Sequence, residues 1–178
     1  MNLSSLMCYA SLVCLGAFLP QDQAVSQALR TEPVSSSSIL AVGESHSFCV
    51  ASINFYNDSR VCLVAGAHYT FHVDACSTWK DLQIVTDANG WTAEQAPFGT
   101  RRLVRRMEWR RRFPTANWFE LVGTIGQNEC NHFRIGCGDT GKKYSPTVSG
   151  PFYAFANDLP SKYRNNSGSI RVTIKRVE

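Results

Sequence analysis

The chain has 178 residues and a net charge of +4, from 18 Lys and Arg against 14 Asp and Glu. Apolar residues make up 44% of it and charged residues only 18%, which excludes an intrinsically disordered chain and a coiled coil. The length suits one domain with short appendages.

The amino end has the pattern of an export signal. An apolar run covers residues 6–19, no Lys or Arg precedes Arg30, and small residues at 24, 26 and 28 suit a signal peptidase. The run is short for a membrane span, so we expect a mature protein without an integral membrane segment, secreted or periplasmic. The expected organisation is a signal peptide at 1–26, a Ser-rich arm or linker at 27–44 and a folded domain at 45–178.

Cleavage of that signal leaves five of the seven cysteines. In an oxidising compartment most of them are expected to pair, and an odd number leaves at least one unpaired. We predict a disulfide between Cys130 and Cys137, which bracket a short segment. We predict a second between Cys49 and Cys62, on either side of a turn at 57–58, which leaves Cys76 free.

The rest of the chain is typical of short strands separated by turns. Alternating or β-branched and aromatic segments predict strands at 69–75, 118–126, 151–156 and 170–175. Turn-forming residues fall at 56–59, 87–90, 138–141 and 165–168. With no long helical pattern, this favours an all-β fold, an antiparallel β-sandwich or jelly roll.

One basic segment, residues 101–113, is ambiguous. Leu103 with Met107, and Trp109 with Phe113, have helical spacing. The segment is either a solvated basic surface or a binding patch for an anionic partner, such as an acidic polysaccharide or a lipid head group. Export argues against nucleic acid. The candidate patch consists of Arg101, Arg102, Arg105, Arg106, Arg110, Arg111 and Arg112.

Common catalytic motifs are absent from the sequence. It contains no nucleophile elbow, no zinc-protease HExxH, no phosphate-binding loop and no EF-hand loop. We therefore expect a binding protein that is not an enzyme.

The loop between the last two predicted strands gathers oxygen donors. Asp158 offers a carboxylate, and Asn165 and Asn166 offer amide oxygens. Calcium takes about 6–8 oxygen ligands, so these residues and nearby carbonyls form a candidate site in which two sugar hydroxyls could complete the shell. The alternative is a plain hairpin turn at 165–168, with Asp158 capping the bend at Pro160.

This loop resembles that of the PA-I type galactophilic lectins, calcium-dependent bacterial β-sandwiches with a galactose-binding-domain-like jelly-roll fold. The resemblance is carried by Asn157-Asp158, Pro160, Tyr163 and Asn165-Asn166-Ser167-Gly168. Weaker similarity covers the segments 71–79, 117–126 and 133–136.

The resemblance implies a specific set of site residues. Ca²⁺ would be held by the side chains of Asp158, Asn165 and Asn166 and by the backbone carbonyls of Lys162 and Leu82. The sugar would contact Asp158, Leu159, Lys162, Asn165 and, in a loose alignment, Gln95. Family members often assemble, so a homo-oligomer is a further expectation.

Two features depart from the family pattern. The His and Gln of its central sugar-binding loop have no clear match. Two cations, Lys162 and Arg164, lie in the loop that carries the resemblance, residues 157–168, which we call the ligand loop. The expected partner is therefore a galactose-type sugar or an anionic glycan. The alternative is a non-catalytic structural or protein-binding β-sandwich with a degenerate metal site, which binds anionic partners through the Arg-rich segment.

Overall fold

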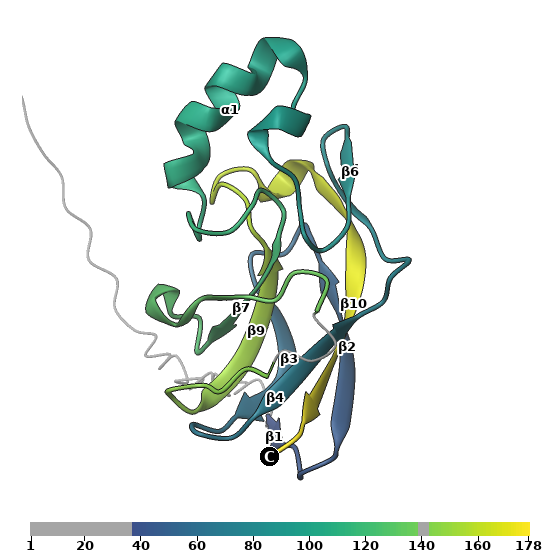
Figure 1. The fold of residues 1–178 in the computed structure, drawn as a ribbon, viewed down its shortest axis with the longest axis vertical. Helices are drawn as coiled ribbons and strands as arrows, with labels where there is room; N and C mark the ends of the chain where they lie inside the picture. Colours follow the sequence, from purple (N-terminus) through teal and green to yellow (C-terminus); the bar gives the residue numbers. More distant parts are fainter. Residues whose placement is uncertain (1–36, 139–142) are drawn as a thin grey trace, which may run out of the picture. The chain divides into compact units, whose positions relative to one another are not determined.

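Two β-sheets pack face to face in the computed structural model, which describes residues 37–138 and 143–178 (Figure 1). The first sheet has the strand order β1-β3-β9-β7-β8, with bounds Ser38–Ile39, Asn57–Leu63, Gly150–Ala156, Leu121–Ile125 and Phe133–Arg134. Its strands pair antiparallel except β1 with β3. This confirms the predicted all-β sandwich.

The second sheet is built around the long strand β10. The antiparallel path runs β2-β10-β5-β6, and β4 also pairs with β10. The bounds are Ser45–Ala51, Asn166–Arg176, Trp79–Asp81, Ile84–Thr86 and Tyr69–Val73. The predicted signal peptide at 1–26 and most of the arm at 27–44 lie outside the described residues.

The core forms between the inward faces of the two sheets. Ile170, Val172 and Ile174 of β10 are fully buried, while Arg171 between them and Lys175 after them are exposed. This is the period of two that the sequence predicted for the last strand. Facing residues include Val61, Leu121 and Phe152, all of them fully buried.

The predicted turn at 56–59 is wrong. Asn57 begins β3, and the chain turns earlier, at residues 52–55. The turn-forming residues instead make a bulge: the pairing with β9 shifts between Asp58 and Cys62, Arg60 has a φ of 58°, and its N–H donates to Asp58 Oδ1. The turn at 87–90 is confirmed, and the one at 138–141 extends beyond the described residues.

The predicted turn at 165–168 is also wrong. Asn165 ends the 3-10 helix η5 (Tyr163–Asn165), and Asn166, Ser167 and Gly168 already pair with β5. Gly168 has a φ of 88°, and a Cβ there would lie 3.0 Å from the Trp79 Cα. The glycine therefore serves a close strand contact and not a hairpin.

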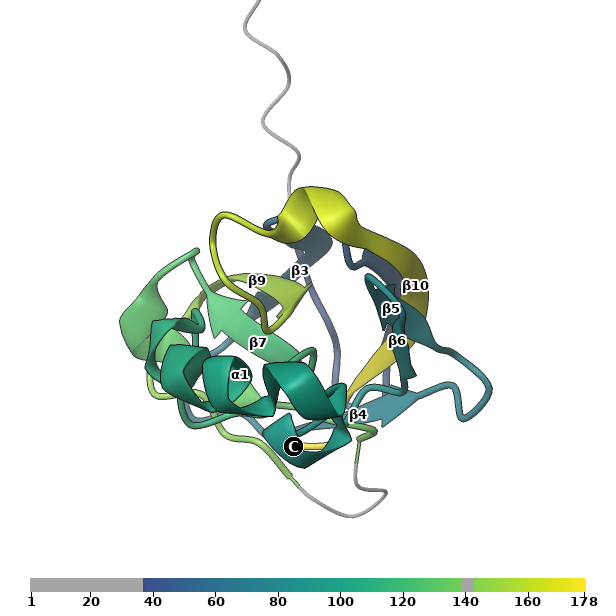
Figure 2. The same ribbon diagram turned by 90° about the horizontal axis from the view of Figure 1, so that it is seen from above.

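The Arg-rich segment is helical. It forms α1 (Arg101–Met107) and the 3-10 helix η3 (Glu108–Arg110), preceded by η1 (Ala93–Gln95) and η2 (Phe98–Thr100). The remaining 3-10 helix, η4, covers Glu129–Asn131. Figure 2 shows α1 at the same end of the sandwich as the loop between β9 and β10. No helix within the described ranges is long and apolar enough to cross a membrane.

Neither predicted disulfide is formed. All five cysteines in the described part of the chain are free. Cys49 and Cys62 lie on β2 and β3, strands of different sheets, so the turn expected between them does not bring them together. Cys130 and Cys137 are separated by the extended strand β8.

Candidate functional site

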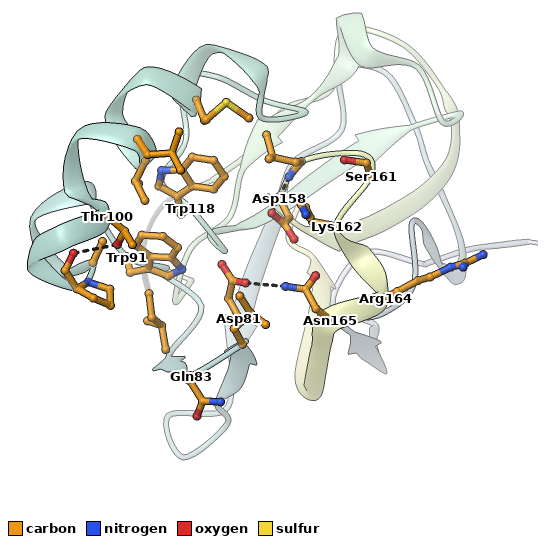
Figure 3. Close-up of a pocket in the computed structure, with 18 residues that line it drawn as sticks. Asp81, Gln83, Trp91, Thr100, Trp118, Asp158, Ser161, Lys162, Arg164 and Asn165 are labelled. Atoms are coloured by element: carbon orange, nitrogen blue, oxygen red, sulfur yellow. Dashed lines mark hydrogen bonds between the residues drawn. The ribbon is translucent and has the colours of Figure 1, made fainter.

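A pocket of about 850 Å³ opens between the β9–β10 loop, the β5–β6 hairpin and α1 (Figure 3). Five predicted site residues line it: Leu82, Asp158, Leu159, Lys162 and Asn165. The predicted ligand loop and the distant Leu82 are therefore brought to one place.

Asp158 provides a buried carboxylate two residues after the end of β9, with only 2% of its surface exposed. Its Oδ1 accepts the Leu159 N–H at 2.6 Å, and its Oδ2 accepts the Asn166 amide at 3.1 Å. Burial raises the pKa of Asp158, although these bonds and the charge of Lys162 oppose the shift. The predicted role of Asp158 as a cap of the Pro160 bend fits only the first of these bonds.

The amide donors of Asn165 and Asn166 bind the carboxylates that line the pocket, Asp81 and Asp158. The Asn165 Nδ2 donates to Asp81 Oδ1 at 3.4 Å, and the Asn166 Nδ2 also donates to the Ser52 carbonyl at 3.2 Å. The Oδ1 atoms of both side chains are buried, with no hydrogen-bond partner among the described protein atoms. Two buried acceptors without donors favour a cation beside them.

Asp81 is a site residue that the sequence analysis missed. It ends β5, pairs in register with Asn166 and lines the pocket. Burial raises the pKa of its carboxyl to about 7, and the nearby charge of Asp158 adds to the shift. The Trp91 indole N–H acts on this pKa in the opposite direction. The only signal in the sequence was its place next to Leu82.

The donor set is made of oxygens. In the described ranges no three His, Cys, Asp or Glu side chains gather as metal ligands, so a zinc-type site is not formed there. Two carboxylates, two amide oxygens and the neighbouring carbonyls fit a hard cation such as Ca²⁺.

The opposite side of the pocket is apolar. Trp91 and Trp118 stack with ring centroids 5.5 Å apart, and Leu103, Val104 and Met107 of α1 line the pocket with them. Gln95, a predicted sugar contact, does not reach this pocket. Its Oε1 accepts the Thr92 N–H at 2.7 Å, so the side chain closes the start of η1.

The predicted patch of seven arginines divides into different environments. Arg112 is buried, which excludes it from an exposed patch. Its guanidinium carbon lies 3.6 Å from the Phe155 ring centroid and 3.7 Å from that of Phe55, and its Nη1 donates to Tyr163 Oη at 2.8 Å. The residue therefore holds the segment after α1 against the ligand loop.

The other arginines are partly engaged. Arg105 pairs with Glu94 at 2.6 Å, Arg111 donates to the Pro114 carbonyl and Arg101 to the Ala96 carbonyl. Arg102, Arg106 and Arg110 are exposed and have no salt bridge within the described ranges.

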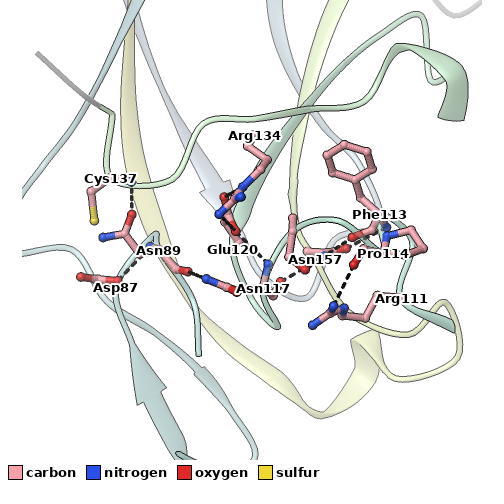
Figure 4. Close-up of polar contacts among 11 residues, drawn as sticks. Asp87, Asn89, Arg111, Phe113, Pro114, Asn117, Glu120, Arg134, Cys137 and Asn157 are labelled. Carbon is pink, nitrogen blue, oxygen red and sulfur yellow. Dashed lines mark hydrogen bonds and ion pairs between the residues drawn. The ribbon is translucent and has the colours of Figure 1, made fainter. Parts of the chain in front are cut away.

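The side chain of Asn157, the residue before Asp158, anchors the start of the loop between β9 and β10. Its Nδ2 donates to the carbonyls of Phe113, Ala116 and Asn117, and its Oδ1 accepts the Phe113 N–H (Figure 4). The neighbouring Glu120 carboxylate binds Arg134 through both oxygens, at 2.6 and 3.0 Å. Every polar atom of the Asn157 amide is used, so the start of the ligand loop is held on its inner side.

Comparisons with known proteins give one kind of match. No family profile matches the chain, and no curated protein sequence is similar to it. Among solved structures, the chain matches "EclA N-terminal domain; PllA-like lectin" with a TM-score of 0.50 and 20% sequence identity, over 74% of this chain and 95% of that chain. The predicted resemblance is confirmed at the level of the fold: the chain has the β-sandwich of a PllA-like lectin.

Proposed function

We propose that this protein is an exported, calcium-dependent carbohydrate-binding protein without catalytic activity. The observation that carries the proposal is the pair of buried, unpartnered Oδ1 atoms of Asn165 and Asn166, in the loop whose Asn166 Nδ2 contacts the Asp158 carboxylate. The β-sandwich shared with a PllA-like lectin supports a carbohydrate as the ligand.

The ion would be held by the side chains of Asp158, Asn165 and Asn166 and by the carbonyls of Leu82 and Lys162. The Asp81 carboxylate faces the same space and adds a second negative charge. Calcium, when bound, supplies open coordination positions for vicinal hydroxyls of a sugar. The protein's part is to hold the ligand loop in place, through Asn157 and Arg112, and to exclude water with the tryptophan pair.

A calcium titration followed by thermal unfolding tests the site. Calcium should raise the melting temperature and EDTA should reverse the rise, because the ion binds only the folded state. Asp158→Asn should abolish the calcium response while the protein remains folded. An unchanged melting curve with calcium and with EDTA would contradict the metal site.

A glycan array, read with calcium and again with EDTA, tests the carbohydrate. Binding to galactose-type sugars that EDTA removes, and that Asp158→Asn lacks, supports the proposal. A protein that binds calcium but no glycan would contradict the carbohydrate function, and one that binds neither would be the structural or protein-binding sandwich considered as the alternative.

A further inference from the structure

A second pocket of about 550 Å³ adjoins the candidate calcium site. It is lined by Trp109 and Arg110 of η3, by Met107, and by the loop residues Leu159, Pro160, Ser161 and Lys162. Met107, Leu159, Ser161 and Lys162 also line the first pocket, so the two cavities share a wall. A ligand longer than one sugar residue could reach from one cavity into the other.

The charge of this second pocket is entirely positive. Arg110 and Lys162 are its only charged lining residues, both are exposed, and neither has a salt bridge in the part of the chain that the structure describes. Arg110 has a guanidinium that can bind a carboxylate or sulfate through two parallel hydrogen bonds, and Lys162 adds a point charge.

Trp109 gives the pocket a flat apolar surface. Its side chain is 73% exposed, and the Arg110 guanidinium carbon lies 5.8 Å from its ring centroid. An exposed indole costs free energy unless a ligand covers it, and a rigid aromatic ring loses little entropy on binding. The C–H face of a sugar ring is a suitable cover, since its hydroxyls can still reach the flanking cations.

The positive charge around the neighbouring calcium site also favours an acidic ligand. A bound Ca²⁺ would lie close to Lys162, whose charge already acts on Asp158, and Arg164 lines the first pocket as well. An acidic group on the ligand would offset this excess of positive charge.

From these contacts we propose that the second pocket is a subsite for an acidic sugar residue, bearing a carboxylate or a sulfate, next to the residue that the calcium site holds. This inference rests on the proposed function, because the neighbouring site anchors the same oligosaccharide. It makes the preferred ligand an acidic glycan and not a neutral galactoside.

The test compares matched pairs of glycans that differ only in one acidic group. With calcium present, calorimetry compares lactose with 6′-sulfolactose, and the carboxyl methyl ester of 6′-sialyllactose with 6′-sialyllactose itself, and an array supplies further neutral and acidic pairs. The wild-type protein should bind the acidic member about five- to tenfold more tightly, the size expected of an exposed charged contact. The two acidic forms distinguish sulfate from carboxylate.

A double variant and a control locate the preference. Arg110→Gln with Lys162→Gln should bind the acidic and neutral members equally, whereas Arg102→Gln with Arg106→Gln removes the same charge from α1 and should keep the preference. The ratio is taken within each variant, so an altered calcium affinity cancels.

The outcomes separate the two proposals. Equal binding of both members by the wild type, with calcium dependence intact, would overturn the subsite alone. A preference that survives in the Arg110/Lys162 variant, or is lost equally in the control, would also overturn it. Failure to bind any glycan, with calcium still bound, would reject both the subsite and the carbohydrate function.

Discussion

The carboxyl groups of Asp81, at the end of β5, and of Asp158, in the β9–β10 loop, face one pocket, and burial together with the charge of Asp158 raises the pKa of Asp81 to about 7. Asp158 is buried and Asp81 half-buried, and neither has a salt bridge among the described residues, so their charged forms cost free energy in the metal-free protein. The site can therefore be tested by measuring how the stability of the metal-free protein depends on pH and on the Asp81 carboxyl.

The stability of the metal-free protein should depend on pH through Asp81. Its pKa in the folded state, about 7, lies above the ordinary value of 3.8, so the folded state binds more protons between these pH values. The free energy of unfolding should therefore fall as pH rises from about 4 to about 7. Denaturant unfolding in EDTA measures this slope, and Asp81→Asn should flatten it. Equal slopes in the two proteins would contradict the assignment.

Asp81→Asn should also weaken calcium binding. The variant keeps the shape of the side chain but removes one negative charge beside the ion, so we expect an affinity about tenfold lower. Calorimetric titration with calcium measures the change. In EDTA the same variant should be more stable than the wild type above pH 7, because the desolvation of the charged carboxylate and its repulsion from Asp158 are gone. An unchanged calcium affinity would place Asp81 outside the coordination sphere.

The part of the site that is local in sequence could be predicted. Asp158, Asn165 and Asn166 lie within one loop, and their oxygen donors and turn chemistry can be recognised without the fold. The secondary structure predicted for these residues was less accurate, because Asn166 pairs with Asp81 in a sheet and does not form a hairpin turn. A register between strands more than eighty residues apart depends on packing that no local pattern encodes.

The apolar side of the pocket could not be predicted for a similar reason. Trp91 and Trp118 are far apart in sequence and meet through an isolated bridge between their backbones. Arg112 looked like one member of a basic patch, and only the packing of Phe55, Tyr163 and Phe155 around it shows a buried role. The composition of a segment gives its charge but not which side chains face inward.

Arg112→Lys should destabilise the protein although it keeps the charge. Lysine lacks the planar guanidinium that lies between the aromatic rings and donates to Tyr163 and the Phe55 carbonyl. Loss of buried cation–π contacts and of hydrogen bonds from a charged donor costs about 3 kcal/mol in unfolding free energy. Urea unfolding checks the value. Arg106→Lys, on the exposed face of α1, is the control and should change stability by less than about 0.5 kcal/mol. Similar losses of unfolding free energy in both variants would show that the aromatic rings around Arg112 contribute no specific stability.

Gly168→Ala should disturb both the fold and the calcium site, whereas Gly66→Ala should disturb the fold only slightly. Both glycines have positive φ angles, 88° and 78°, so each alanine carries a backbone cost of about 1 kcal/mol. At Gly66 a Cβ meets nothing within 4 Å, but at Gly168 it would lie 3.0 Å from the Trp79 Cα and 3.1 Å from the Thr78 carbonyl oxygen.

The contact at Gly168 would push β5 away from β10, and the next pairs along the same ladder end with Asn166 and Asp81. We therefore expect Gly168→Ala to lose about 2–3 kcal/mol of stability and to bind calcium more weakly than Gly66→Ala. Unfolding curves in EDTA measure the first effect, and calcium titration of the folded variants measures the second. Equal calcium affinities in the two variants would mean that the spacing of β5 and β10 does not control the position of the ligands.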